Sequence, residues 1–194
     1  MKAKKKNIEI EIKVQLEKTK KLLDFLQKKA KFVGESRQID KYFTPVHRNY
    51  LKTHPVNEWL RLRDSSGKHS INSKNWYREK DGRTHHCDEF ETPVENMEQM
   101  ENIFRVINIK PIVTVDKVRR AWRYKNYEVA VDLVKGLGDF VEIEFKGNTN
   151  KKPSEITAEM IVFLKNLDCG KITRDYVGYP FALLFPKEVN KEEC

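Results

Sequence analysis

The sequence predicts an α+β fold in which a mainly antiparallel sheet closes into an eight-stranded barrel with helices packed outside. Eight segments alternate between apolar residues and others, and helical spacing appears only between runs of these segments. Several of the alternating segments also place charged side chains on one face and apolar ones on the other. The predicted strands are residues 7–16, 37–44, 57–64, 69–78, 84–94, 112–123, 126–135 and 139–147.

The first predicted strand shows the alternation most plainly. Glu9, Glu11 and Lys13 share one face, while the apolar residues between them share the other. Later strands repeat the pattern. The acids on their charged faces are Asp132, Glu142 and Glu144, and the bases are Arg61, Arg63, Lys74, Lys117 and Arg119.

A sheet of this kind can be open or closed. An open sheet would leave the charges in solvent and cover its apolar face with the helices. A closed barrel would gather the charges into a shared interior and remove the exposed strand edges, for which eight antiparallel strands suffice. The acids and bases are also largely segregated by strand, whereas solvated faces usually mix both signs. We therefore expect a tunnel-like barrel with a charged interior.

Apolar stripes at helical spacing predict three helices between the strands. The first stripe begins at Leu22 and includes Ala30 and Val33, and the third follows Pro153, a residue favoured in a first helical turn. The predicted helices cover residues 19–31, 97–107 and 153–167, and residues 176–185 are expected to be partly helical. No linker divides the chain, so residues 1–194 are expected to form one domain with loose charged ends at 1–6 and 187–194.

Composition excludes several classes of protein. Hydrophobic residues make up 39% and charged residues 35%, which is typical of a soluble globular chain. No apolar run approaches a membrane span, and the basic N-terminus lacks the apolar segment of a secretory signal, so we expect a cytoplasmic protein without a membrane partner. Cys87, Cys169 and Cys194 are too widely spaced for a disulfide framework or a Cys-rich zinc site.

Charges inside a barrel need partners, because an isolated buried charge is costly. Clustered carboxylates favour a hard divalent cation such as Mg²⁺ or Mn²⁺. Clustered Arg and Lys side chains favour phosphate oxygens. The net charge of +9 agrees with an anionic ligand, although a basic surface also keeps a protein soluble. A metal-bound polyphosphate would satisfy both halves of the interior.

An ordered set of short motifs runs from residue 7 to residue 185. It comprises Glu9-x-Glu11-x-Lys13, residues 38–43, Trp59 to Arg63, Glu89-x-Glu91, Lys117-x-Arg119, Asp132, and Gly136 to Glu144. This set resembles the signature of the CYTH, or triphosphate tunnel metalloenzyme, family, which includes CyaB-type (class IV) adenylyl cyclases and thiamine triphosphatase. The stretch from Gly136 to Glu144 looks closest to the CyaB-type branch.

The resemblance implies a role for each charged position. Glu9, Glu11, Asp132, Glu142 and Glu144 would hold the divalent metals, Mg²⁺ or Mn²⁺. Lys13, Arg61, Arg63, Lys74, Lys117 and Arg119 would hold the phosphates, with Lys13 as an alternative general base. Further candidates are Glu89, Glu91, Lys171 and Arg174.

The chain departs from the family pattern at three places. Cys87 stands where relatives often have Arg, two residues before Glu89. The segment around Lys74 fits the Lys-bearing strand of the family only loosely. Asp175-Tyr176 replaces the usual Ser-Tyr, which leaves Lys171 and Arg174 as nearby basic contacts.

Three classes of function stay open at this point. The first is an enzyme, most simply a cyclase that converts ATP to cyclic AMP and pyrophosphate, or else a hydrolase of thiamine triphosphate, tripolyphosphate or a nucleoside triphosphate. The second is a non-catalytic polyphosphate- or nucleotide-binding module, which would gain little from five carboxylates. The third is an RNA-binding protein, but no nucleic-acid motif is found, so nucleic acid is not an expected partner. A homodimer is left open.

Overall fold

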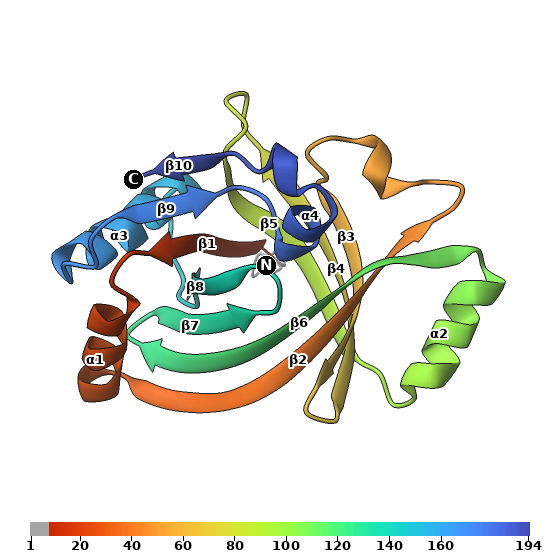
Figure 1. Cartoon of the computed structure of the whole chain (residues 1–194), viewed down its shortest axis with the longest axis horizontal. Helices are drawn as coiled ribbons and strands as arrows, with labels where there is room; N and C mark the ends of the chain where they lie inside the picture. Colours follow the sequence, from red (N-terminus) through yellow and green to blue (C-terminus); the bar gives the residue numbers. More distant parts are fainter. Residues whose placement is uncertain (1–7) are drawn as a thin grey trace, which may run out of the picture.

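The computed structural model describes residues 8–194, and a strongly curved antiparallel sheet dominates it (Figure 1). The expectation that residues 1–6 are loose falls outside the described residues. The strands are β1 (Ile8–Leu16), β2 (Lys31–Pro45), β3 (Glu58–Ser65), β4 (Lys68–Arg78), β5 (Thr84–Pro93), β6 (Ile109–Tyr124), β7 (Tyr127–Val134), β8 (Gly138–Phe145), β9 (Ile172–Asp175) and β10 (Lys191–Glu193). The helices are α1 (Thr19–Lys29), α2 (Met97–Val106), α3 (Pro153–Asn166) and α4 (Tyr179–Leu184), with 3₁₀ turns at Tyr50–Lys52 and Pro186–Glu188.

The sheet closes because β1 pairs with both ends of the strand order. Its first residues pair with β5, where Ile8 lies opposite Asp88, and its middle pairs with β8, where Glu11 lies opposite Glu144. The closed ring runs β1-β5-β4-β3-β2-β6-β7-β8, and its pairings are antiparallel. The predicted eight-stranded barrel is confirmed.

β2 and β6 are longer than alternation alone predicts. They pair along almost their whole lengths, starting with Lys31 opposite Arg123. Val33, which helical spacing assigns to the first helix, therefore lies in β2, and the chain leaves α1 at Ala30, whose backbone is extended. Pairing with a distant strand here overrides the local helical pattern.

The C-terminal residues also differ from the prediction. Residues 187–194 include β10, which pairs with β9 so that Lys191 lies opposite Asp175. β9 in turn continues along β1, with Arg174 opposite Val14. Both strands are too short to show alternation in the sequence, since β9 has 4 residues and β10 has 3. Only their pairing partners fix them.

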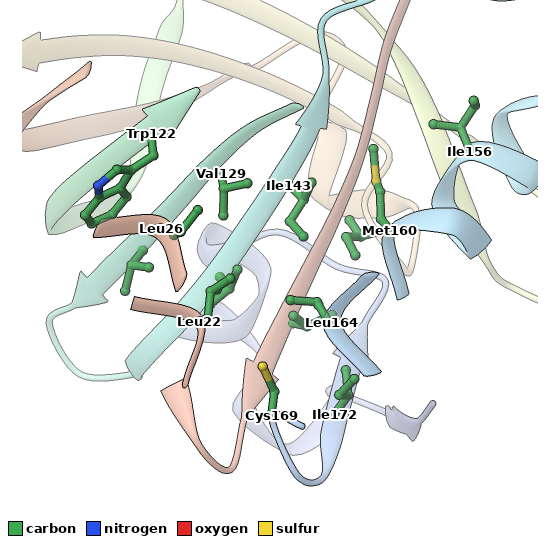
Figure 2. Close-up of a cluster of buried hydrophobic side chains, with 14 of the residues drawn as sticks. Leu22, Leu26, Trp122, Val129, Ile143, Ile156, Met160, Leu164, Cys169 and Ile172 are labelled. Carbon is green, nitrogen blue, oxygen red and sulfur yellow. The ribbon is translucent and has the colours of Figure 1, made fainter. Parts of the chain in front are cut away.

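α1 and α3 cover the outer apolar face of the barrel, as predicted. Leu22 and Leu26 of α1, with Met160 and Leu164 of α3, join one buried cluster with the strands (Figure 2). The strands contribute Ile10, Ile12, Val14, Trp122, Val129, Val131, Val141 and Ile143 to this cluster. α2 packs on a separate cluster around Phe104, away from α1 and α3 (Figure 1). Among residues 8–194, no helix is both long enough and apolar enough to span a membrane.

Two glycines form the turn between β7 and β8. Gly136 and Gly138 have φ values of 83° and 94°, a region that residues with a Cβ adopt only at a cost. The Gly-x-Gly stretch therefore makes a hairpin rather than a nucleotide-binding loop. This turn sets the register that aligns β8 with β1.

One end of the barrel interior is apolar, which the charge pattern does not predict. Aromatic and aliphatic residues replace the charged ones on the inner faces of the strands there, and α4 packs against them. This apolar plug consists of Tyr42, Val56, Trp59, Val115, Val134, Phe140, Tyr179 and Phe181. The charged interior therefore occupies only the remaining part of the barrel.

We predict that Phe181→Ala destabilises the protein strongly, because Phe181 is 1% exposed within the apolar plug. Removing such a side chain typically costs about 3–5 kcal/mol. Phe90→Ala is the matched control, since Phe90 is 59% exposed. Denaturant unfolding measures both, and equal losses of stability would show that α4 does not anchor this end of the barrel.

Candidate active site

A cavity of about 250 Å³ occupies the charged part of the barrel. Every strand of the closed ring contributes side chains to its wall, so the charged faces converge on one space. The sequence-predicted residues that line it are Glu9, Glu11, Lys13, Arg61, Arg63, Lys74, Glu89, Glu91, Lys117, Arg119, Glu142, Glu144 and Arg174.

Two of the predicted residues lie elsewhere. Asp132 points into the barrel interior, as predicted, but it is fully buried beneath Lys117, Arg119 and Tyr179, which bind its carboxylate, and so it does not line the cavity. Lys171 is exposed and pairs with Glu193 at 2.6 Å, outside the cavity. Lys171 precedes β9 and points toward solvent, so the fold does not bring it to the site.

Four glutamates of β1 and β8 meet on one part of the wall. Strand register sets Glu11 opposite Glu144, and Glu9 and Glu142 follow two residues away on the same faces. We call Glu9, Glu11, Glu142 and Glu144 the glutamate cluster. Burial raises the pKa of Glu11 well above its usual range, and the neighbouring carboxylates add to this effect. Burial, followed by the charge of Glu9, raises the pKa of Glu144 to about 7.

Basic side chains partly neutralise the glutamate cluster. The contacts are Lys74 with Glu9, Arg119 with Glu142, and Lys146 with Glu144. Glu11 is approached less closely, with 3.9 Å between its carboxylate and the ammonium of Lys74. Burial favours the protonated form of Glu9, but Lys74 overcomes it and lowers the pKa of Glu9 to about 2.

Lys74 also compensates for the departure at Cys87. The Cys87 thiol donates to Glu9 over 3.4 Å, and burial raises its pKa, so it supplies no positive charge. Lys74 lies 3.6 Å from Glu89 as well as against Glu9. The positive charge beside Glu9 and Glu89 therefore comes from Lys74 on the neighbouring strand β4.

Arg61 and Arg63 of β3 are held by one buried acid. Asp40 on β2 accepts two hydrogen bonds from the Arg63 guanidinium, at 2.6 Å and 2.7 Å, and lies 3.5 Å from that of Arg61. Burial opposes ionisation of Asp40, but Arg61 and then Arg63 hold its pKa well below its usual range. The pair is thereby fixed before any ligand arrives.

Lys117 and Arg119 of β6 are held in the same way by Asp132 of β7. Asp132 accepts from Lys117 at 2.8 Å and from Arg119 at 2.7 Å and 2.6 Å. The Tyr179 hydroxyl of α4 donates to the same carboxylate at 3.0 Å. Burial, followed by the charge of Arg119, lowers the pKa of Lys117 to about 8. Asp132 accepts all of these hydrogen bonds, so its carboxylate orients Lys117 and Arg119.

Lys13 lies where the charged cavity meets the apolar plug. Its ammonium is 2.8 Å from the Asp175 carboxylate and also donates to the backbone oxygen of Val177. It lies 4.7 Å from the ring centre of Tyr179 and 5.9 Å from that of Phe140. These contacts join β1 to the segment that connects β9 with α4.

Arg174 of β9 is a buried cation without a carboxylate partner among the described residues. It is 5% exposed, donates to the backbone oxygen of Thr84 at 2.8 Å, and its Nε has no partner. Burial lowers its pKa. Because it lines the cavity, it is suited to an anionic ligand.

Sequence reasoning did not assign roles to Asp40, Tyr179 and Asp175. Asp40 falls inside a quoted motif and alternates in phase with Tyr42, so a signal was present but was not used. Asp175 stood in a motif that departs from the family pattern, which also marked its position, whereas Tyr179 gave no signal. They belong to a short helix and a short strand whose positions only tertiary packing fixes.

The donor set of the glutamate cluster fits a hard divalent cation. Its oxygen ligands come from two adjacent strands. The raised pKa values of Glu11 and Glu144 indicate that too little positive charge surrounds these two carboxylates. Within residues 8–194, however, no three His, Cys, Asp or Glu side chains are grouped closely enough to hold a metal ion. Three of the glutamates instead form ion pairs with Lys74, Arg119 and Lys146, so these bases must turn away before a cation can bind.

We predict that Asp40→Asn lowers the free energy of unfolding by about 3–5 kcal/mol, because it leaves the two buried guanidinium groups of Arg61 and Arg63 without their counter-ion. Asp116→Asn is the matched control: Asp116 makes the same two-bond pair with Arg37, but at the exposed surface. Chemical denaturation tests both. A loss no larger for Asp40 than for Asp116 would mean that the buried pair is not structurally required.

We predict that Glu11→Gln stabilises the protein in excess chelator, on the order of 1 kcal/mol, by removing a buried charge from among like charges. Saturating Mg²⁺ should reverse the order, because a bound cation stabilises only the native wild type. Glu95→Gln, at an exposed position, should change neither value. Thermal unfolding with and without Mg²⁺ tests this prediction. A lower stability of Glu11→Gln than of the wild type in excess chelator would contradict it.

Solved structures support the fold assignment. A Pyrococcus horikoshii protein superposes with a TM-score of 0.75 at 22% identity, covering 92% of this chain and 99% of that one. A candidate adenylyl cyclase from Hippeastrum, described as having a dominant triphosphatase activity, gives a TM-score of 0.65 at 19% identity, covering 92% and 96%. At these identities the likeness concerns the fold.

Sequence comparison is more specific. A candidate adenylate cyclase from Methanocaldococcus jannaschii is 31% identical over 165 residues, which cover 84% of this chain and 91% of that protein. The CYTH domain family matches residues 7–178. This range includes the glutamate cluster, the basic pairs Arg61/Arg63 and Lys117/Arg119, and Asp175. The chain belongs to the CYTH domain family.

Proposed function

We propose that this protein is a divalent-metal-dependent enzyme that acts on a triphosphate-bearing small molecule, converting ATP to cyclic AMP and pyrophosphate. One observation carries the proposal: a cluster of glutamates and two pairs of basic side chains line one shared cavity, beside the apolar plug. A polyphosphate neutralises the bases, and a divalent cation neutralises the acids.

Each wall of the cavity has a distinct task in this reaction. Glu9, Glu11, Glu142 and Glu144 would hold the metal, which when bound offsets negative charge on the phosphate oxygens. Arg61 and Arg63 bind phosphate oxygens from one side, and Lys117 and Arg119 bind them from the other. Asp40 and Asp132 keep these bases in place, so little reorganisation is needed when the substrate enters.

Cyclisation requires a specific orientation of the substrate. The ribose 3′ oxygen attacks the α-phosphorus, the hydroxyl proton leaves to a base or to water, and the bond to the departing pyrophosphate oxygen breaks. The basic pairs stabilise the charge that develops on that leaving group. Lys13, predicted as a phosphate ligand or a general base, already donates to Asp175 and Val177, which supports the role of a donor.

Hydrolysis is the second candidate. Water would attack the terminal phosphorus of thiamine triphosphate, tripolyphosphate or a nucleoside triphosphate within the same clamp. The Hippeastrum protein, which shares the fold, is described as having a dominant triphosphatase activity, whereas the M. jannaschii relative, at 31% identity, is described as a candidate adenylate cyclase and favours cyclisation. A non-catalytic binding module is disfavoured, because four buried glutamates would only weaken the binding of an anion without a metal.

The test is incubation with ATP, thiamine triphosphate or tripolyphosphate, with Mg²⁺, Mn²⁺ or excess chelator, while cyclic AMP, pyrophosphate and phosphate are measured. We expect metal-dependent turnover that Glu9→Ala, Glu11→Ala and Glu144→Ala abolish. Arg63→Ala should lower kcat/KM by roughly 10- to 100-fold, since a lost charge-assisted bond costs about 1.5–3 kcal/mol.

Arg37→Ala is the control for the arginine variant, because Arg37 makes a similar two-bond pair with an Asp but lies at the surface. Full turnover in excess chelator would reject the metal-dependent mechanism. Equal losses from Arg37→Ala and Arg63→Ala would instead indicate a diffuse electrostatic surface. The ratio of cyclic AMP to free phosphate decides between the two candidate reactions.

A further inference from the structure

The position of Lys13 is set by a residue at the far end of the chain. Lys13 shares a strand face with Glu9 and Glu11, and strand register sets it opposite Glu142. Its nearest carboxylate is nevertheless Asp175, and among residues 8–194 it forms no ion pair with a glutamate. Asp175 therefore determines which way this ammonium points.

The Lys13–Asp175 pair is buried and well supplied with contacts. Lys13 is 8% exposed and Asp175 is 7% exposed. The Asp175 carboxylate also accepts from the backbone N–H of Val177 at 3.2 Å, while the Val177 oxygen accepts from Lys13. The turn after β9 thus encloses the ammonium from two sides, against the ring of Tyr179.

The charges around Glu142 show what this arrangement prevents. Burial opposes ionisation of Glu142, yet Arg119 and then Lys117 hold its pKa well below its usual range, with Lys13 contributing less. If Lys13 turned from Asp175 toward Glu142 and Glu11, it would add a further cation to the glutamate cluster. A metal ion and this ammonium would then compete for the same oxygens.

We propose that Asp175 is a positioning residue: it holds Lys13 against the apolar plug and away from the glutamate cluster, so that this ammonium does not join Lys74, Arg119 and Lys146 in competing with a divalent cation for the cluster. In this position the ammonium also lies beside Tyr179 on the cavity wall, where it would donate to the phosphate chain of the substrate. The first role rests on the metal binding of the proposed function, and the second rests on its substrate.

The experiment measures Mg²⁺ binding by thermal shift in the absence of substrate. Asp175→Asn should weaken the apparent affinity for Mg²⁺ by roughly tenfold, because the released ammonium opposes the cation. The double variant Lys13→Gln, Asp175→Asn should recover most of the wild-type affinity, since no mobile cation remains. Asp175→Glu should resemble the wild type. Glu193→Gln removes the exposed ion pair with Lys171 and should have no effect.

Recovery in the double variant separates positioning from a general loss of structure, which a second substitution would not repair. The inference is overturned if Asp175→Asn binds Mg²⁺ like the wild type, if the double variant binds no better than Asp175→Asn, or if the wild type shows no Mg²⁺ shift. Should Asp175→Asn fail to fold, the double variant and Asp175→Glu still decide. The assay needs no turnover, so absence of cyclase or triphosphatase activity would reject the proposed function alone.

Discussion

The pairing of β1 with β8 is the constraint on which the rest of this structure depends. It sets Glu11 opposite Glu144 and brings the first strand of the chain against the last strand of the main run. Without that contact the sheet would be open, and its charged faces would spread over a wide surface at close to 5 Å per strand. Closure turns a set of ordinary solvated faces into one wall around one cavity.

Closure also creates an electrostatic problem, which the fold solves in two different ways. On the basic side, Asp40 and Asp132 each support a pair of cations, so these groups are neutralised and held in place from behind. On the acidic side Lys74 and Arg119 keep the pKa values of Glu9 and Glu142 low, but Glu11 and Glu144 have raised pKa values. The charges are therefore balanced around the bases and only partly balanced around the acids. Such an asymmetry suits a ligand that brings positive charge to one wall and negative charge to the other.

The C-terminal segment packs into the barrel interior beside the cavity. α4 fills one end of the interior with Tyr179 and Phe181, and the turn before it binds Lys13 through Asp175. The same short stretch thus supplies apolar packing, a hydrogen bond to Asp132 and an ion pair to β1. Stability and site geometry are coupled here, because a change in α4 alters the support of both lysines that contact the Tyr179 ring.

The sequence by itself determined the ring of strands, the outer helices and the convergence of most charged residues, because alternation at a period of two is a local property that pairing preserves. It placed Glu9, Arg61 and Glu144 on inner faces correctly for that reason. Only the tertiary structure decided that Asp132 is fully buried beneath the side chains that bind it, that Lys171 faces solvent, and that Val33 belongs to β2. Only the tertiary structure also placed α4 inside the barrel and Asp175 against Lys13. These features depend on contacts between residues far apart in the chain, within elements too short to carry a periodic signal, and no local pattern can encode them.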